Sequence, residues 1–355
     1  MIKKTENFLR AVLRSQRSRF RSRRIIAQEL DVFRRGYDTV VAQFPDHALS
    51  RAQKRMITQY ARDVFGDAAH AGSLMTFAAF RGEFVEGWIP WTYYLAVLLP
   101  RWNNHPLIGA KTMSRRFVDP DLMPDLAYRV RDCWIDRDYR PVEPDALAGI
   151  LFRDHQHVFI KADLGASGTD VTKVSRAGFD AAAHAVKGNL AVQAPVTQHG
   201  FFDQITPDSV ATIRLTTVKQ IGARAVCPGC HIRIGINSAD IVANVNSVEV
   251  GIMDELGTMG EFGKLHDWTR VDQHPQTGFR FGGQLIPGFA KAQELCLRLH
   301  DSIPHLTIVG WDIAIDQSGA PRLIEMNTSG PGFDGCQILV GPRFAGLGWE
   351  DVWKN

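Results

Sequence analysis

Residues 309–332, VGWDIAIDQSGAPRLIEMNTSGPG, constrain the fold of this chain more than any other stretch. Two short apolar runs, 309–315 and 322–326, flank the polar sequence Asp316-Gln317-Ser318-Gly319, and a loop rich in glycine and proline follows them. Apolar runs bounded by turn residues are typical of strands, and a short polar gap joins antiparallel strands. We therefore expect a β-hairpin here.

Folding this hairpin places an acid of the first strand, Asp312, beside Glu325 and Asn327 at the end of the second strand. Carboxylate and amide oxygens suit a hard divalent cation, and Mg²⁺ commonly takes one or two carboxylates together with phosphate oxygens. Either acid alone would ordinarily be a buried turn-capping aspartate or a solvent-facing glutamate. The three residues in one hairpin, followed by a glycine-rich loop, favour a metal site.

The bulk properties are those of an ordinary globular protein. A chain of 355 residues with 45% apolar and 22% charged residues can build two or three lobes, and a formal net charge of +3 is too small to indicate a polyanionic partner. The longest apolar run, 88–100, is shorter than the roughly 20 residues that span a bilayer. We expect it to be a core helix or an interfacial segment.

The amino terminus lacks the sustained apolar core of a secretory signal. Five scattered cysteines indicate no disulfide framework. We therefore expect a protein of the reducing cytoplasm.

Residues 1 to about 100 have a mainly helical pattern, and the segment 7–30 carries a dense set of arginines. Such a basic helix could bind nucleic acid, a membrane surface or an acidic carrier protein. It could also be a solvated helix face that pairs with Glu29, Asp31 and neighbouring acids. Both interpretations remain open at this point.

Residues 157–175, HVFIKADLGASGTDVTKVS, indicate a phosphate-binding loop between two strands. The first strand delivers Lys161 to the small-residue loop 165–169, and 171–174 is the expected return strand. Glycines let backbone N–H groups approach phosphate oxygens, and a lysine supplies a point charge. The pattern is not a P-loop, which continues with GKS or GKT and then a helix.

Two further strands are predicted to carry an arginine among apolar residues. Arg214 lies in 209–218 and Arg233 lies in 231–236. An arginine is costly to bury in a strand unless it meets an anion. The pair therefore suggests clamps on a phosphate or a carboxylate.

The sequence Cys227-Pro-Gly-Cys230 lies between these strands and could be half of a zinc site or a redox pair. Because no second CxxC motif is present, we interpret the Pro-Gly pair as a hairpin turn. Residues 244–288 are expected to be rich in loops, and 289–302 to form an amphipathic helix that leads into the hairpin.

Together these residues resemble the ATP-grasp superfamily, in particular its sugar-transfer-associated branch. The resemblance covers roughly residues 105–345 and is strongest at HPQTG, at VGWDIAID with LIEMNTSGPG, and at SVATIRLTTV. It implies an α+β protein with the ATP-grasp fold, two α+β lobes with ATP between them, preceded by a mainly helical amino-terminal region. The implied domains are the helical region 1–104, a first lobe 105–193 with the lysines and the glycine-rich loop, and a second lobe 194–355 with the metal site.

The resemblance also implies ATP and two Mg²⁺ ions as cofactors, and it assigns roles to individual residues. Asp312, Glu325 and Asn327 would hold magnesium, Arg214 and Lys161 would act on the transferred phosphate, and Arg233 would lie on the substrate side. The implied nucleotide contacts are Lys111, Lys161, the loop residues Gly165, Ser167 and Gly168, the hinge residues Gln193 and Val196, and His199.

The activity implied by the resemblance is ADP-forming ligation of a carboxylate to an amine through an acylphosphate, in natural-product or polysaccharide biosynthesis. This chemistry needs in-line positioning and charge neutralisation, with no nucleophilic side chain. The alternatives are an ATP-dependent small-molecule kinase and a non-catalytic nucleotide-binding partner protein. The expected partners are small-molecule acids and amines, one of which could be carried on a peptide, a carrier protein or tRNA. A membrane partner is not expected, and the chain could form a homo-oligomer.

Overall fold

The computed structural model describes residues 24, 26–102, 108–163, 171–237 and 240–354. Contacts divide the chain into two compact units, each described by itself below. The first comprises Met1–Trp102, Asp267–Thr269 and Gly341–Asn355, and the second comprises Asn103–His266 and Arg270–Val340. The domain limits 1–104, 105–193 and 194–355 stay a prediction. The arginine-rich stretch lies almost entirely outside the described residues, as do Gly165, Ser167 and Gly168 of the predicted phosphate loop.

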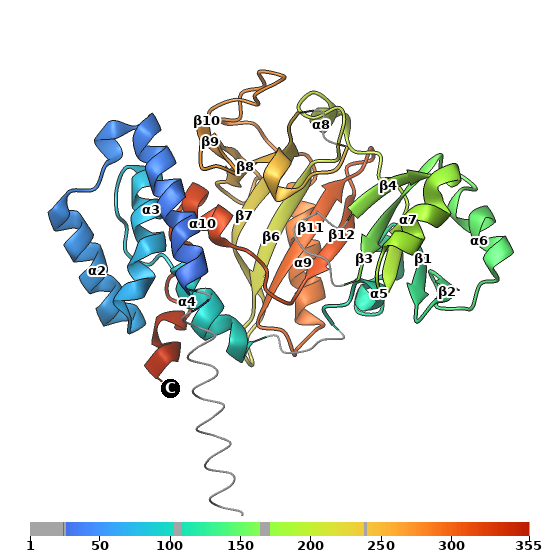
Figure 1. The fold of residues 1–355 in the computed structure, drawn as a ribbon, viewed down its shortest axis with the longest axis horizontal. Helices are drawn as coiled ribbons and strands as arrows, with labels where there is room; N and C mark the ends of the chain where they lie inside the picture. Colours follow the sequence, from blue (N-terminus) through green and yellow to red (C-terminus); the bar gives the residue numbers. More distant parts are fainter. Residues whose placement is uncertain (1–23, 25, 103–107, 164–170, 238–239, 355) are drawn as a thin grey trace, which may run out of the picture. The chain divides into compact units, whose positions relative to one another are not determined.

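The first unit is helical, as the sequence pattern indicates (Figure 1). Its longest element with sharply defined ends is α2, which begins after a capping box between Ser50 and Gln53 and ends at Gly66, whose φ is +79°. Its described elements are the helical residues 26–43 and η1 (Pro45–His47), α2 (Arg51–Phe65), η2 (Ala68–His70), α3 (Ala71–Arg81), α4 (Trp91–Tyr93), η3 (Tyr94–Leu98), η4 (Leu99–Arg101) and η8 (Trp349–Lys354).

The apolar run 88–100 forms the successive helical turns α4, η3 and η4 inside this unit. Tyr93, Tyr94 and Leu98 are fully buried in its core. The run is therefore core structure, which was one of the two interpretations of its sequence. Among the described residues, no helix combines the length and the apolar character that crossing a membrane requires.

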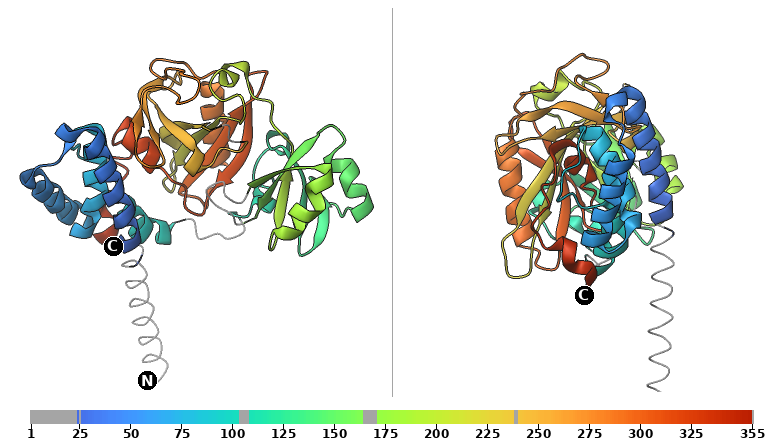
Figure 2. Two further views of the ribbon diagram at one scale, coloured as in Figure 1. Left: turned by 45° about the horizontal axis from the view of Figure 1, so that its top comes forward. Right: turned by 90° about the vertical axis from the view of Figure 1, so that its left-hand side faces the viewer.

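The second unit contains a five-stranded sheet with strand order β2-β1-β5-β3-β4, in which all pairs are antiparallel. Helices α6 and α7 pack on it through an apolar cluster that includes Leu147, Leu151, Phe179 and Ala183 (Figure 2). The elements are α5 (Lys111–Ser114), η5 (Pro120–Leu122), β1 (Asp125–Val130), β2 (Cys133–Asp136), α6 (Pro144–Leu151), β3 (His157–Ala162), β4 (Val171–Ser175), η6 (Arg176–Gly178), α7 (Phe179–Ala185) and β5 (Leu190–Gln193).

The same unit contains a seven-stranded antiparallel sheet with strand order β10-β9-β8-β7-β6-β11-β12. Its elements are α8 (Gly200–Asp203), β6 (Thr212–Val218), β7 (Val226–Gly235), η7 (Asn244–Asn246), β8 (Ser247–Ile252), β9 (Met259–Leu265), β10 (Arg270–Val271), α9 (Phe289–Asp301), β11 (Ile308–Ile315), β12 (Pro321–Asn327) and α10 (Asp334–Val340). Antiparallel sheets with separate helices confirm the expected α+β class.

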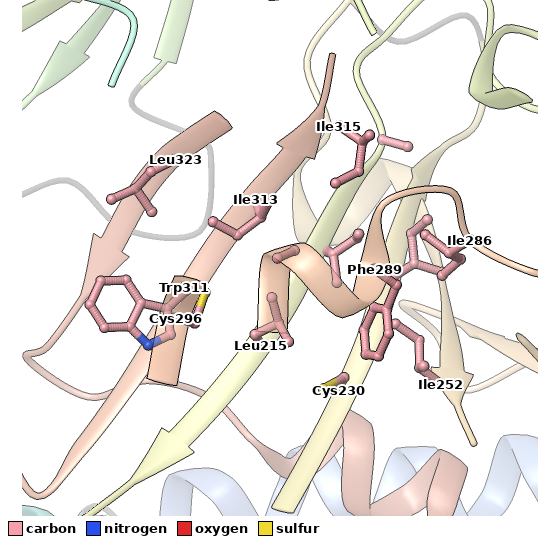
Figure 3. Close-up of a cluster of buried hydrophobic side chains, with 14 of the residues drawn as sticks. Leu215, Cys230, Ile252, Ile286, Phe289, Cys296, Trp311, Ile313, Ile315 and Leu323 are labelled. Atoms are coloured by element: carbon pink, nitrogen blue, oxygen red, sulfur yellow. The ribbon is translucent and has the colours of Figure 1, made fainter. Parts of the chain in front are cut away.

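The two faces of the seven-stranded sheet differ in character because side chains alternate along each strand. One face buries Leu215, Trp311 and Ile313 against Phe289 and Cys296 of α9 (Figure 3). The other face carries the polar residues between them, including Arg214 and Asp312. The apolar face anchors the sheet, so the polar face is free to hold a site.

Residues 244–288 are rich in loops, as expected, although β8, β9 and β10 also lie within them; the glycines and charges of β9, MGEFGKL, hide its strand pattern. One sequence expectation is wrong in this sheet. Pro228 and Gly229 do not form a hairpin turn but lie inside β7, and the chain reverses at residues 219–225 instead. The thiols of Cys227 and Cys230 lie 3.4 Å apart, and all five cysteines are free.

Candidate functional site

The hairpin β11–β12 brings the predicted metal ligands together on the polar face. Asp312 lies directly opposite Glu325 on one side and opposite Arg214 of β6 on the other, and Asn327 lies opposite Gly310. Directly opposed residues of antiparallel strands share a face. The strand register therefore gathers residues that are far apart in the sequence.

Asp312 forms a two-pronged ion pair with Arg214. The Nε of Arg214 donates to Oδ1 over 2.6 Å and one terminal guanidinium nitrogen donates to Oδ2 over 2.9 Å, while Nδ2 of Asn327 donates to Oδ2 over 3.0 Å. Burial alone would raise the pKa of Asp312, but Arg214 and Arg233 hold it well below its usual range. Asp312 is therefore ionised.

Two lysines lie around Glu325. Nζ of Lys111, the first residue of α5, is 3.3 Å from Oε1 of Glu325. Nζ of Lys161, at the end of β3, donates to the carbonyl oxygen of Ile324 over 3.4 Å. Burial lowers the pKa of Lys161, whereas Glu325 and Asp125 act in the opposite direction. Three basic side chains thus surround two carboxylates.

A cavity connects these residues with the five-stranded sheet. Lys161, Gln193, Val196, Asp312 and Glu325 line it among apolar side chains that could flank a flat ring. Those apolar residues are Phe159, Val171, Val210, Ile241, Val242 and Ile324. Its volume of about 130 Å³ is below the roughly 300 Å³ at which ligand pockets begin, so a larger ligand would require side chains or backbone to move.

Gln193, predicted at the nucleotide hinge, directs its side chain into a buried network. Its Nε2 donates to Oδ1 of Asp125 over 2.7 Å and to the carbonyl oxygen of Ile324 over 3.1 Å. Asp125 also accepts from Tyr128 over 2.6 Å, and burial raises the pKa of this carboxyl. Gln193 therefore braces the wall near Lys161 through its side chain.

Asp125 was not identified from the sequence, and neither was Asp163. The carboxylate of Asp163 accepts from the backbone N–H of Thr112 over 2.9 Å, which ties α5 to the strand that carries Lys161. The sequence does contain a clue to the role of Asp163, because this residue lies only two positions after Lys161. For Asp125 the signal was an acid among the apolar residues of β1, but its partner Gln193 comes from β5, which is distant in the sequence.

Lys111, Arg214 and Asn327 contact Glu325 or Asp312 without lining the cavity, whereas two further predicted site residues have other neighbours. His199 is the N-cap of α8, where its Nδ1 accepts from the backbone N–H of Phe201 over 3.1 Å. Arg233 lies on β7, two strands from Asp312 but on the same face of the sheet. There it neighbours Glu249 of β8, which lies opposite it.

The residues of the hairpin fit a magnesium site by their donor chemistry. Asp312, Glu325 and Asn327 offer two carboxylates and an amide, the usual small protein contribution to a Mg²⁺ site completed by substrate phosphates. In the described part of the chain, no group of three or more His, Cys, Asp or Glu residues forms an all-protein cage. Arg214 and Lys111 balance the two carboxylates in this structure.

Comparison with known proteins gives one family match. The model of the sugar-transfer-associated ATP-grasp family matches residues 153–347, which is more than half of the chain. No curated protein matches the sequence.

Solved structures give distant matches. One is the biotin carboxylase domain of Hydrogenobacter thermophilus 2-oxoglutarate carboxylase with MgADP and bicarbonate, at 14% identity and a TM-score of 0.38, covering 62% of this chain and 40% of that one. Another is Aspergillus clavatus N5-carboxyaminoimidazole synthase with ADP and 5-aminoimidazole ribonucleotide, at 13% identity and a TM-score of 0.42, covering 69% and 51%. A third is Coxiella burnetii D-alanine-D-alanine ligase, at 12% identity and a TM-score of 0.35, covering 70% and 52%. The chain thus matches only about half, or less, of each of these proteins.

Proposed function

Because the chain belongs to the sugar-transfer-associated ATP-grasp family, we propose that it is an ATP-dependent ligase that joins a carboxylate to an amine and releases ADP and phosphate. The observation that carries the proposal is the pairing of Asp312 with both Glu325 and Arg214 beside the buried Lys161. This set offers metal-binding oxygens and phosphate-binding cations at one end of a cavity. It contains no nucleophilic serine, cysteine or histidine, and this chemistry needs none.

The proposal assigns magnesium to Asp312, Glu325 and Asn327, with two ions as in the sequence prediction. Bound there, the metal would neutralise charge on the transferred phosphate. Lys161 and Lys111 add positive charge around Glu325, and we assign them to the nucleotide phosphates. The glycine-rich loop 165–169 follows Lys161 in the chain, and we assign it to the same phosphates.

The adenine ring is assigned to the apolar lining around Phe159, Val171 and Ile324. At the hinge, the N–H of Ala194 already donates to the carbonyl oxygen of Pro124 over 2.7 Å, and Pro195 has no N–H. Recognition of the base therefore rests on the hinge carbonyl groups and on Val196. The side chain of Gln193 supports this wall from behind.

The chemistry proceeds in two steps. A carboxylate oxygen of the first substrate attacks the γ-phosphorus of ATP, which forms an acylphosphate and releases ADP. The amine then attacks the acyl carbon, the bond between the acyl carbon and the phosphate oxygen breaks with its electron pair going to phosphate, and the nitrogen loses a proton as the amide forms. We assign Arg214, which Asp312 holds in the sheet, to stabilising the charge on the transferred phosphoryl group.

The test is trapping of the acylphosphate. The protein is incubated with Mg²⁺-ATP, a panel of carboxylic acids and hydroxylamine, and both ADP and hydroxamate are measured. Formation of both supports the ligase. A stable phosphorylated product would instead show a kinase, and no ATP consumption with any acid would show a nucleotide-binding protein without turnover.

Two near-isosteric variants test the assigned metal ligands. Asp312→Asn and Glu325→Gln each remove one negative charge while nearly keeping the shape, so we expect turnover to fall at least about 100-fold. Glu255→Gln makes the same change at an exposed position and should keep full activity. Wild-type turnover in either site variant, measured as ADP release, would refute the metal assignment.

A further inference from the structure

A second polar cluster lies on the same face of the seven-stranded sheet as Asp312 and Arg214. We call it the β7–β9 cluster, and it comprises His231, Arg233, Glu249 and Lys264. His231 lies opposite Arg214, Arg233 opposite Glu249, and Glu249 opposite Lys264. The cluster therefore continues the row of charged residues away from the hairpin.

The charges of this cluster do not cancel. Glu249 is closest to Lys264, at 3.1 Å, and this ion pair holds the pKa of Glu249 well below its usual range although burial opposes it. Nε of Arg233 lies 3.8 Å from Glu249, and Nε2 of His231 lies 3.9 Å away, both beyond hydrogen-bonding distance. Arg233 therefore adds a positive charge that Glu249 only partly balances.

The remaining acid that faces the cluster is Asp334, the first residue of α10. Burial and the neighbouring Glu249 raise the pKa of Asp334. On the other side, Asp312 is already paired with Arg214. Neither acid supplies a hydrogen bond to Arg233 or His231.

Buried donors in the cluster lack acceptors. Over the described residues, both ring nitrogens of His231 and Nε of Arg233 are buried without a hydrogen-bond partner, and His231 is only 2% exposed. Leaving a buried polar group unsatisfied costs about 1–3 kcal/mol, so such groups normally have a partner. An N–H of imidazole and an N–H of guanidinium both require an acceptor, and an anion provides it.

Helix α10 closes the cluster on one side. A Cβ at Gly335 would lie 2.9 Å from Oε2 of Glu249 and 3.3 Å from Cε1 of His231, so the helix approaches here without a side chain. The side chain of Arg233 is 15% exposed, although its Nε is buried.

We propose that His231 and Arg233 bind an anionic group of a substrate, a carboxylate or phosphate other than the group that is phosphorylated. The proposal rests on the ligase function and names a class of substrate for it. Neighbouring strands are about 4.8 Å apart, so β7 lies one strand spacing from Arg214 and two from Asp312. An anion held there is a few bonds from the reacting atom, which fits a short dicarboxylic acid or an amino acid.

The test compares probes that differ only in one charge. On the acid side, succinate is compared with succinamate in the hydroxylamine assay. On the amine side, alanine is compared with alaninamide as the acceptor of the acyl group. In one of these two arms we expect the wild type to use the more anionic probe at least 10-fold more efficiently, and that arm identifies the substrate that carries the anion.

Variants connect this preference with the cluster. Arg233→Met should lower the preference at least 10-fold, mainly through KM, whereas Arg233→Lys should keep part of it because the charge remains. His231→Gln should lower it less. Arg280→Met, at an exposed arginine, is the matched control and should behave as the wild type.

The outcomes separate the two proposals. Hydroxamate formation with equal efficiency for charged and neutral probes would overturn the anion site and leave the ligase function intact. If no acid gives ADP, the anion site is tested by thermal unfolding instead. The melting temperature is measured in the presence of Mg²⁺ and a non-hydrolysable ATP analogue, with and without succinate or alanine. Stabilisation by succinate or alanine that Arg233→Met abolishes would support it, and the absence of any such shift would overturn it.

Discussion

At the scale of single residues, the site is built from charges that cannot be removed independently. Asp312 and Arg214 are both buried, and each supplies most of the compensation for the other. Deleting one partner of such a pair commonly costs about 3–5 kcal/mol because the other charge is left unpaired. Asp312→Asn also leaves the charge of Arg214 unpaired, although it keeps an acceptor oxygen that alanine would remove, so the thermal stability of this variant is measured beside its activity.

A buried histidine of the first unit predicts a pH dependence of stability. His70 is 3% exposed, its Nδ1 lies 3.0 Å from Oγ1 of Thr92, and burial lowers its pKa to about 4. Because the unfolded chain binds a proton at higher pH than the folded chain, stability is fully present above about pH 6.5. It is lost as the pH falls towards 4, by up to about 3 kcal/mol.

The measurement is the free energy of unfolding of the wild type and of His70→Gln between pH 7 and pH 4. The variant should lose less stability over this range, since glutamine does not titrate. Other titrating groups cancel in the difference between the two proteins. Parallel curves would contradict the assignment.

At the scale of elements, strand β11 needs a glycine at position 310, because a side chain there would collide with Pro331 and Arg214. A Cβ at Gly310 would lie 2.8 Å from Cβ of Pro331 and 3.3 Å from Cδ of Arg214. We expect Gly310→Ala to displace Arg214 from Asp312, lowering turnover at least about 10-fold while costing about 1–3 kcal/mol of stability.

The matched control for this change is Gly149→Ala, in the middle of α6. Nothing lies within 4 Å of the added methyl group there, and alanine is the better helix former by up to about 1 kcal/mol. Activity and chemical denaturation should be measured on both variants. Unchanged turnover in Gly310→Ala would show that Arg214 tolerates the displacement.

Local sequence patterns predicted much of this architecture. The hairpin 309–326, the strand before Lys161 and helix 289–302 are found as β11–β12, β3 and α9, because their apolar spacing and turn residues act locally. The neighbours of Asp312 within the hairpin, Glu325 and Asn327, were predicted, but its ion pair with Arg214 could not be, since Arg214 reaches it through the register of strands almost a hundred residues apart. Glu249 was missed because β8 lies in a stretch whose glycines and charges suggest loop.

At the scale of the whole molecule, the first unit depends on residues far apart in the chain. Trp349 is buried, its ring lies 4.7 Å from that of Trp102, and its carbonyl oxygen accepts from Tyr93 over 2.9 Å. Truncating such a tryptophan typically costs about 3–5 kcal/mol.

We therefore expect Trp349→Ala to lower the melting temperature of one calorimetric transition, that of the helical unit. The stabilisation of the other transition by Mg²⁺ and an ATP analogue should persist. Leu285→Ala, at an exposed leucine, is the control. A single transition that shifts as a whole in Trp349→Ala would show that the two units unfold together.

The helical unit is assembled from segments that are far apart in the chain, which affects how it folds during synthesis. Ribosomes deliver the chain from its amino end, and a domain usually folds once all its parts have emerged. Residues 1–102 must wait for 341–355, and the entire second unit is translated in between. During that interval Trp102 lacks the ring of Trp349 and the hydroxyl of Tyr93 lacks its acceptor carbonyl, so we expect the helical unit to complete its core only after Trp349 has been added.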